Sequence, residues 1–283
     1  MSFSAQWLTL REPVDHASRA PDLARRVSAH FSGSATVSVV DLGCGTGSNL
    51  RATAALLPAR QDWLLVDYDA ALLDEARAHL SRWADEAQAD GEVLRLVTSG
   101  KRLAVRTRQA DLTCDLDTVL AGRPDLVTAS ALFDLISESW IETFAARLAG
   151  LGAAFYTVLT YDGRDAFSPP HPQDAAVIAA FAQHQRGDKG FGPAAGPEGA
   201  AALARAFRAA GFSVSEGDSP WRIGPDHAAL ARPLLDGIAG AVGETGSMAA
   251  DALADWLAFR LAQVARPGAL IVTGHRDTFA VMP

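Results

Sequence analysis

The sequence predicts an α/β fold with a doubly wound, mostly parallel sheet of seven strands. Apolar, often β-branched runs alternate along the chain with amphipathic helical segments, as they do in βαβ units. The first run, VVDLG, leads into a turn with three glycines. The run AAFYTVLTYDG is almost wholly apolar, as a central parallel strand is when helices cover both of its faces.

Composition excludes several classes of protein. The 283-residue chain has 49% hydrophobic and 20% charged residues, which is ordinary globular composition. Its formal net charge of -8 argues against a nucleic-acid partner, because such binding depends on basic side chains that neutralise phosphates. No signal sequence or membrane-spanning run is evident, and two cysteines are too few for a disulfide framework. We expect a cytoplasmic protein, and its abundant alanine and arginine are typical of a GC-rich bacterium.

The first half of the chain accounts for five strands. Apolar residues four apart, at Leu23, Val27 and Phe31, predict a leading helix over residues 15–31 with Pro21 in its first turn. Two alternating runs around Ser99-Gly100 predict a hairpin or a bulged third strand. The other strands are expected at 36–43, 62–69, 123–135 and 153–163, and helices at 48–58, 70–88 and 138–152.

The second half departs from simple alternation in two places. Residues 163–200 contain a Pro-rich turn, a short helix with Asp174 as its N-cap and a Gly-rich loop, and residues 225–267 are mostly helical. A helix at 196–212 and strands at 212–224 and 269–281 complete the pattern. We expect one domain over 1–283, with 1–34 as a helical cap and both departures forming a lid, because each follows the carboxyl end of a strand.

The turn after the first strand is suited to a ligand. Gly43, Gly45 and Gly47 permit positive φ values and leave no Cβ between the backbone and a bound molecule. A helix N-terminus behind such a turn favours negative charge. Dinucleotides and S-adenosylmethionine are both bound in this way. The dinucleotide fingerprint G-x-G-x-x-G would place its third glycine where Ser48 or Leu50 stands.

With Asp41 before G-x-G-x-G, the chain from about residue 35 to 162 resembles the class I S-adenosylmethionine-dependent methyltransferases. The resemblance implies a Rossmann-like sheet with an antiparallel last strand, and S-adenosyl-L-methionine as cofactor. It implies that Asp67, about 20 residues after the last glycine, accepts hydrogen bonds from ribose hydroxyls. Tyr68 would pack on the adenine. The alternatives without a ligand are that the glycines form a purely structural βα turn and that Asp67 caps a helix.

Further cofactor residues follow from the same resemblance. Asp111 resembles the acid that takes the adenine amino group, beside the backbone N–H of Leu112, although Asp115 and Asp117 compete for this role. Ser130 would pass beside the methionine part of the cofactor. Cys44 is counted among the cofactor residues, where it serves as a small filler of the turn rather than as a nucleophile.

Substrate and catalytic residues are sought in the lid. Tyr161, Asp162 and His184 are the catalytic candidates, and Tyr161, Arg186 and Lys189 the substrate-binding candidates. The two cations would suit a carboxylate or phosphate. In the leading segment, Arg19 would reach the cofactor carboxylate and His16 the substrate. A solvated loop and an amphipathic cap explain the same residues without function.

We therefore expect a methyltransferase that acts on a small molecule by in-line methyl transfer. No metal is expected, because no two histidines have helical ligand spacing. An NAD(P)-dependent oxidoreductase is one alternative, and a non-catalytic S-adenosylmethionine-binding regulatory protein is another. Neither a nucleic acid nor a membrane is expected as partner, and the oligomeric state does not follow from the sequence.

Overall fold

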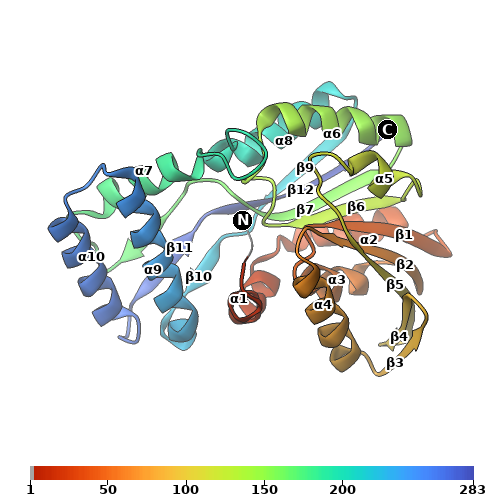
Figure 1. Cartoon of the computed structure of the whole chain (residues 1–283), viewed down its shortest axis with the longest axis horizontal. Coiled ribbons are helices and arrows are strands. Elements are labelled where there is room, and N and C mark those ends of the chain that lie inside the picture. The colour runs from red at the N-terminus through yellow and green to blue at the C-terminus, as the bar shows by residue number, and fades with distance from the viewer. Residues whose placement is uncertain (1–2) are drawn as a thin grey trace.

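A nine-stranded sheet forms the centre of the molecule, which the computed structural model describes over residues 3–283 (Figure 1). The strand order is β3-β4-β5-β2-β1-β6-β7-β12-β9. The strands are β1 (Thr36–Leu42), β2 (Arg60–Asp67), β3 (Glu86–Asp90), β4 (Val93–Thr98), β5 (Lys101–Gln109), β6 (Leu126–Ser130), β7 (Ala154–Tyr161), β9 (Ser213–Asp218) and β12 (His275–Val281).

The predicted fold class is confirmed by the pairing of these strands. The five central strands, β5-β2-β1-β6-β7, are parallel. The last strand, β12, is antiparallel to both β7 and β9. Strand order reverses between β1 and β6, so the sheet is doubly wound, and ligands bind at such a point outside the carboxyl ends of the strands.

Helices cover both faces of the sheet. Successive strand residues such as Val39 and Val40 belong to apolar clusters on opposite faces, which explains why the central strands are apolar throughout. One face carries α2, α3 and α4, and the other carries α5, α6 and α8. The helices are α1 (Ala5–Ser18), α2 (Pro21–Phe31), α3 (Ser48–Thr53), α4 (Ala70–Trp83), α5 (Leu116–Leu120), α6 (Glu138–Leu151), α7 (Asp174–Gln185), α8 (Gly199–Ala209), α9 (Ala228–Thr245) and α10 (Ala250–Gln263), with short 3-10 turns η1 (Ala54–Leu56), η2 (Gly196–Glu198) and η3 (Pro225–His227).

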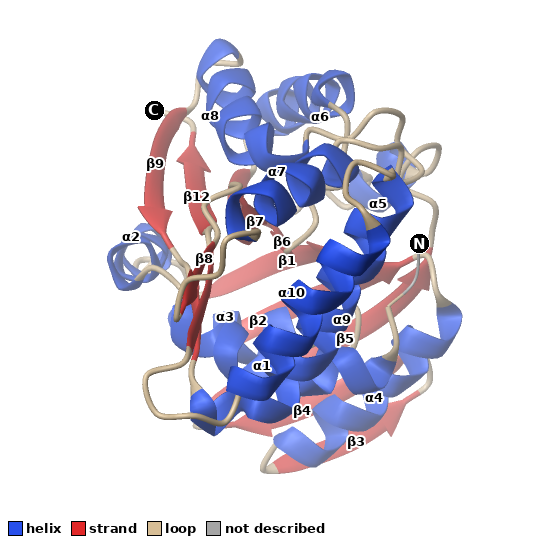
Figure 2. Ribbon diagram, turned by 90° about the vertical axis from the view of Figure 1, so that its left-hand side faces the viewer, coloured by secondary structure: helices blue, strands red, loops and turns tan. Residues whose placement is uncertain are grey.

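A second, three-stranded sheet extends the molecule on one side. It has the order β10-β11-β8, with β8 (Ala166–Ser168), β10 (Trp221–Ile223) and β11 (Leu270–Thr273). Together with α7, α9 and α10 it forms a side lobe at the left of Figure 1, and α10 lies in the foreground of Figure 2. Of residues 3–283, no helix is long and apolar enough to cross a membrane.

Each of the last two predicted strands is divided between the two sheets. The strand predicted at 212–224 is β9 followed by β10, separated at Pro220, which lacks the N–H that a sheet interior requires. The strand predicted at 269–281 is β11 followed by β12, separated at Gly274. A Cβ at Gly274 would lie 2.2 Å from Asp162 Oδ1, so the strand has no room for a side chain there.

Several predicted boundaries are wrong. The helix predicted at 70–88 ends at Trp83, and its last residues form β3, an added edge strand that pairs with β4. The hairpin expected at Ser99-Gly100 is present as β4 and β5. The predicted leading helix is two helices, α1 and α2. Asp174 is the first residue of α7 rather than its N-cap, which is Gln173.

Candidate functional site

A cavity of about 410 Å³ lies at the carboxyl ends of the central strands. It spans the point where strand order reverses, because its walls come from the segments that follow β1, β2, β5 and β6. Two further walls come from α1 and from the turn after α7. The lining residues are Phe3, Leu8, Arg11, Gly43, Gly45, Asp67, Tyr68, Asp69, Leu72, Ala110, Asp111, Leu112, Thr113, Ser130, Ala131, Leu132, Leu135, Lys189, Gly190 and Phe191.

The glycine turn forms the floor of this cavity. Gly43, Gly45 and Gly47 have φ values of 62°, 52° and 76°, which L side chains rarely adopt. Gly43 and Gly45 line the cavity, whereas Gly47 is the N-cap of α3 and lies outside the lining. A Cβ at Gly45 would lie 2.9 Å from Leu8 Cδ1. The turn therefore brings bare backbone to the cavity, directly beneath α1.

Two predicted cofactor residues, Asp41 and Cys44, are buried next to the turn and do not line the cavity. Asp41 is fully buried, and its Oδ1 accepts a hydrogen bond of 2.7 Å from Asn49 Nδ2. Burial raises the pKa of Asp41 to about 7. Cys44 is also buried, and burial raises the pKa of its thiol well above the usual value, so it is a packing residue.

Asp67, the predicted ribose-binding residue, lines the cavity. Its Oδ2 accepts a hydrogen bond from Gly45 N at 2.8 Å, and its Oδ1 accepts one from Asp69 N at 3.0 Å. A carboxylate has about four lone-pair sites, so about two remain to face the cavity. Burial raises the pKa of Asp67. Tyr68 beside it is 71% exposed and lines the cavity with its ring unburied.

Asp111, Leu112 and Ser130 line the cavity as well. Asp111 Oδ1 accepts hydrogen bonds from Thr113 N at 2.9 Å and Thr113 Oγ1 at 2.7 Å, which lower its pKa. Within residues 3–283, Asp111 Oδ2 and the Leu112 N–H have no hydrogen-bond partner. After Ser130, Ala131 has a φ of 51°, so the backbone stores strain at the reversal point.

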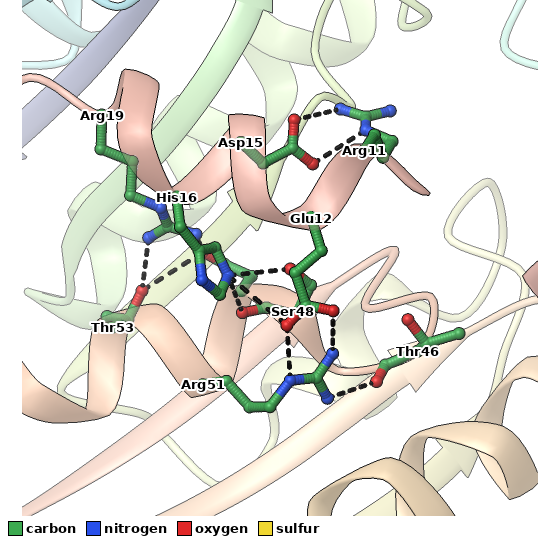
Figure 3. A network of polar contacts seen from close by, with 10 residues as sticks. Arg11, Glu12, Asp15, His16, Arg19, Thr46, Ser48, Arg51 and Thr53 are labelled. Atoms are coloured by element: carbon green, nitrogen blue, oxygen red, sulfur yellow. Dashed lines mark hydrogen bonds and ion pairs between the residues drawn. The ribbon is translucent and has the colours of Figure 1, made fainter. Parts of the chain in front are cut away.

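Helix α1 covers the glycine turn through a set of polar contacts with α3 (Figure 3). Glu12 forms a bidentate ion pair with Arg51, with distances of 2.7 and 2.5 Å. His16 Nε2 lies 3.0 Å from Ser48 Oγ, at the first residue of α3. Arg19 donates to Asn49 Oδ1 at 2.9 Å and to Thr53 Oγ1 at 3.0 Å. These contacts fix α1 over the turn.

The same contacts hold two predicted site residues away from the cavity. Arg19 and His16 do not line the cavity, because both side chains are directed at α3. The cation that α1 brings to the cavity is Arg11, which sequence reasoning missed. Arg11 Nε and Nη2 donate to Asp15 at 2.8 and 3.3 Å, and its guanidinium lies 5.0 Å from the ring centroid of Trp221. Asp15 also accepts from Trp221 Nε1 at 2.9 Å.

Three other candidates lie away from the cavity. Tyr161 is buried, and its hydroxyl donates to Asp165 Oδ2 at 2.5 Å, while burial raises its pKa. Asp162 forms an ion pair with Arg164. Arg186 is paired with Glu198 at 2.6 Å on the surface. Each of these side chains therefore contacts a partner outside the cavity lining.

Lys189, a predicted substrate-binding residue, lines the cavity, and His184 lies outside the lining. Lys189 Nζ lies 3.4 Å from His184 Nδ1, and His184 Nε2 lies 2.9 Å from Glu244 Oε2. Of the predicted lid, the stretch 163–200 contributes Lys189, Gly190 and Phe191 to the lining. Residues 225–267 contribute none to it and belong to the side lobe.

No family model and no curated protein matches the sequence. A cyclopropane-fatty-acyl-phospholipid synthase-like protein from Lactobacillus casei is 14% identical, with a TM-score of 0.49, over 99% of this chain and 94% of that one. A SAM-dependent methyltransferase from Thiobacillus denitrificans, solved with S-adenosyl-L-homocysteine, is 15% identical, with a TM-score of 0.43, over 100% and 99%. The cyclopropane synthase MmaA2 from Mycobacterium tuberculosis is 12% identical, with a TM-score of 0.45, over 92% and 83%.

Proposed function

We propose that this chain is a methyltransferase that transfers the methyl group of S-adenosylmethionine to a small-molecule acceptor. One observation carries the proposal. The cavity at the reversal point joins a bare glycine turn, at Gly43 and Gly45, to an acid whose remaining lone pairs suit a ribose diol, Asp67. Methyl transfer from a sulfonium is an in-line displacement, so the chief tasks of such a site are to hold the acceptor close and to exclude water.

The lining supplies a complementary group for each part of the cofactor. Asp67 would accept hydrogen bonds from the ribose hydroxyls, and the exposed ring of Tyr68 would pack on the adenine. Asp111 and the Leu112 N–H have free hydrogen-bonding capacity for the adenine edge. Arg11 takes the place of Arg19 as the candidate for the amino-acid carboxylate, because it lies one turn beyond Leu8 on the wall above Gly45.

A dinucleotide fits this arrangement less well. Its pyrophosphate would lie at the N-terminus of the helix after the glycine turn. In this chain that helix is α3, and α1 covers it, with His16 on Ser48 and the carboxylate of Glu12 on Arg51 (Figure 3). The glycine spacing and the covered helix terminus thus both favour S-adenosylmethionine over NAD(P).

Two measurements test the proposal. Isothermal titration calorimetry with S-adenosylhomocysteine and with NADH is expected to give binding of the first alone, and binding of NADH alone would overturn it. The second measurement screens a metabolite collection with labelled S-adenosylmethionine, and transfer of the labelled methyl group to an acceptor is expected. Tight S-adenosylhomocysteine binding without turnover on any acceptor, in the presence of cell metabolites, would support a regulatory binding protein instead.

A further inference from the structure

A braced turn brings one lysine into the cavity. Asp188 Oδ1 accepts hydrogen bonds from Gly190 N at 2.7 Å and Gly192 N at 3.1 Å, which closes the turn on one side. On the other side the ring of Phe191 meets Trp140 edge to face, with centroids 5.6 Å apart. Lys189 lies between these two anchors and therefore enters the cavity from a fixed backbone.

The ammonium group of Lys189 is oriented without being neutralised. An ammonium only donates hydrogen bonds, so His184 must accept at Nδ1 and carry its proton on Nε2, which it donates to Glu244. Within the part of the chain that the structure describes, no carboxylate lies within ion-pair distance of Lys189 Nζ. His184 and Glu244 thus direct the lysine while its positive charge remains available.

The other charged groups of the lining are already accounted for. Asp67, Asp69 and Asp111 are acids and suit hydroxyl and amino groups. Arg11 is bound to Asp15 and lies on the α1 wall above the glycine turn, where the proposed cofactor has its carboxylate. Lys189 has no matching group in the proposed cofactor, and the same lining includes the apolar side chains of Leu132, Leu135 and Phe191.

We propose that the acceptor is an apolar molecule with a carboxylate group, which Lys189 binds, and that His184 and Glu244 are positioning residues for that lysine. This inference rests on the proposed function, since it assigns Arg11 to the cofactor and Lys189 to the acceptor. The carboxylate would be held by a charge-assisted hydrogen bond in a partly desolvated site, which makes its loss measurable.

The test compares acids with their neutral amides. The probes are benzoate with benzamide and hexanoate with hexanamide, titrated by ligand-observed NMR into the chain with and without S-adenosylhomocysteine. We expect each acid to bind about tenfold or more tightly than its amide. Lys189→Met should remove this preference and Lys189→Arg should keep it. The matched control is Arg186→Met, which removes a neighbouring cation that lies outside the lining and is paired with Glu198.

The positioning role has its own readout. His184→Gln keeps an oxygen that can accept from Lys189 and should retain the preference for acids, whereas His184→Leu should lose it with unchanged melting temperature and S-adenosylhomocysteine affinity. A merely structural role would change the melting temperature in both variants alike.

Three results would overturn the inference. The first is that acids and amides bind equally well, and the second is that the preference for acids persists in Lys189→Met. The third is that Lys189→Met loses affinity for S-adenosylhomocysteine but not for 5′-methylthioadenosine. The last result would assign the lysine to the cofactor carboxylate. If wild-type chain binds the acids selectively but not S-adenosylhomocysteine, the proposed function fails while the carboxylate site stands.

Discussion

Replacement of Asp67 by asparagine tests the cofactor site most directly. The carboxylate already accepts two backbone hydrogen bonds, from Gly45 and Asp69, and has room for two more from a ribose diol. Asparagine keeps the size but has one acceptor oxygen in place of two. A hydrogen bond to a charged group contributes about 1.5–3 kcal/mol. We therefore expect the Kd for S-adenosylhomocysteine to rise about 10- to 150-fold.

Calorimetry measures this change, and two comparisons make it specific. Asp62→Asn alters an exposed acid on the same strand and should leave the affinity unchanged. The mutation should weaken binding of an analogue without the ribose 2′-hydroxyl less than binding of S-adenosylhomocysteine, because the analogue already lacks the hydrogen bond from that hydroxyl to Asp67. Equal losses for both ligands would mean that Asp67 acts only by holding the turn at Gly45, and an unchanged affinity would refute the ribose contact.

Three further outcomes are expected. Because burial raises the pKa of Asp67 and the cofactor binds its ionised form, S-adenosylhomocysteine affinity should fall as the pH drops through that raised pKa, and Asp67→Asn should remove this pH dependence in calorimetry. Gly45→Ala should lower both the melting temperature and the affinity, since its φ is 52° and its Cβ would lie 2.9 Å from Leu8 Cδ1. The pKa of Asp41 is raised to about 7, above its unfolded value of about 3.9, so between these pH values the folded state binds a proton that the unfolded state releases. The free energy of unfolding, measured by denaturant titration, should therefore fall as the pH rises from about 4 to 7. Asp41→Asn, which can still accept the hydrogen bond from Asn49, should reduce this dependence on pH.

Each of these has a contrary result. A pH dependence of binding that persists in Asp67→Asn would assign the titration to another group. Gly91→Ala is the control for Gly45→Ala, because Gly91 also has a positive φ, of 60°, but a Cβ there would meet no atom within 4 Å. Equal losses of melting temperature and affinity in both variants would mean that the contact with Leu8 is not the cause. A stability curve with the same slope in Asp41→Asn as in the wild type would mean that the aspartate stays ionised when buried.

The parallel core was predictable from the sequence because its signals are local. A buried strand between two helices must be apolar at every position, and the turn after β1 needs glycines whatever the rest of the chain does. Gly43, Gly45, Asp67 and Asp111 line the cavity for this reason, since each lies at or within a few residues of the carboxyl end of a strand.

The walls of the cavity were not predictable in the same way. Pro13 lies inside α1 and obscures its helical pattern, so Leu8 and Arg11 were missed. Tyr161 and Arg186 lie in segments at or after the carboxyl end of a strand, where site residues are expected. Their side chains nevertheless bind Asp165 and Glu198 and do not line the cavity. Sequence spacing gives the position of a residue along a strand or loop, while the direction of a long side chain depends on partners distant in the chain.

The covering helix also has a consequence for how the protein is made. Asp15 accepts its hydrogen bond from Trp221, and the N–H of Ala20 donates to Asp277 at 2.8 Å, so α1 and its linker are held by residues near the other end of the chain. Such distant contacts form late, because closing a long loop has a large entropic cost. The contacts of α1 with α3 can form early, whereas those with Trp221 and Asp277 need the second half of the fold. The helix that covers the glycine turn should therefore become fixed in two steps, and the cavity should reach its final shape only in the second.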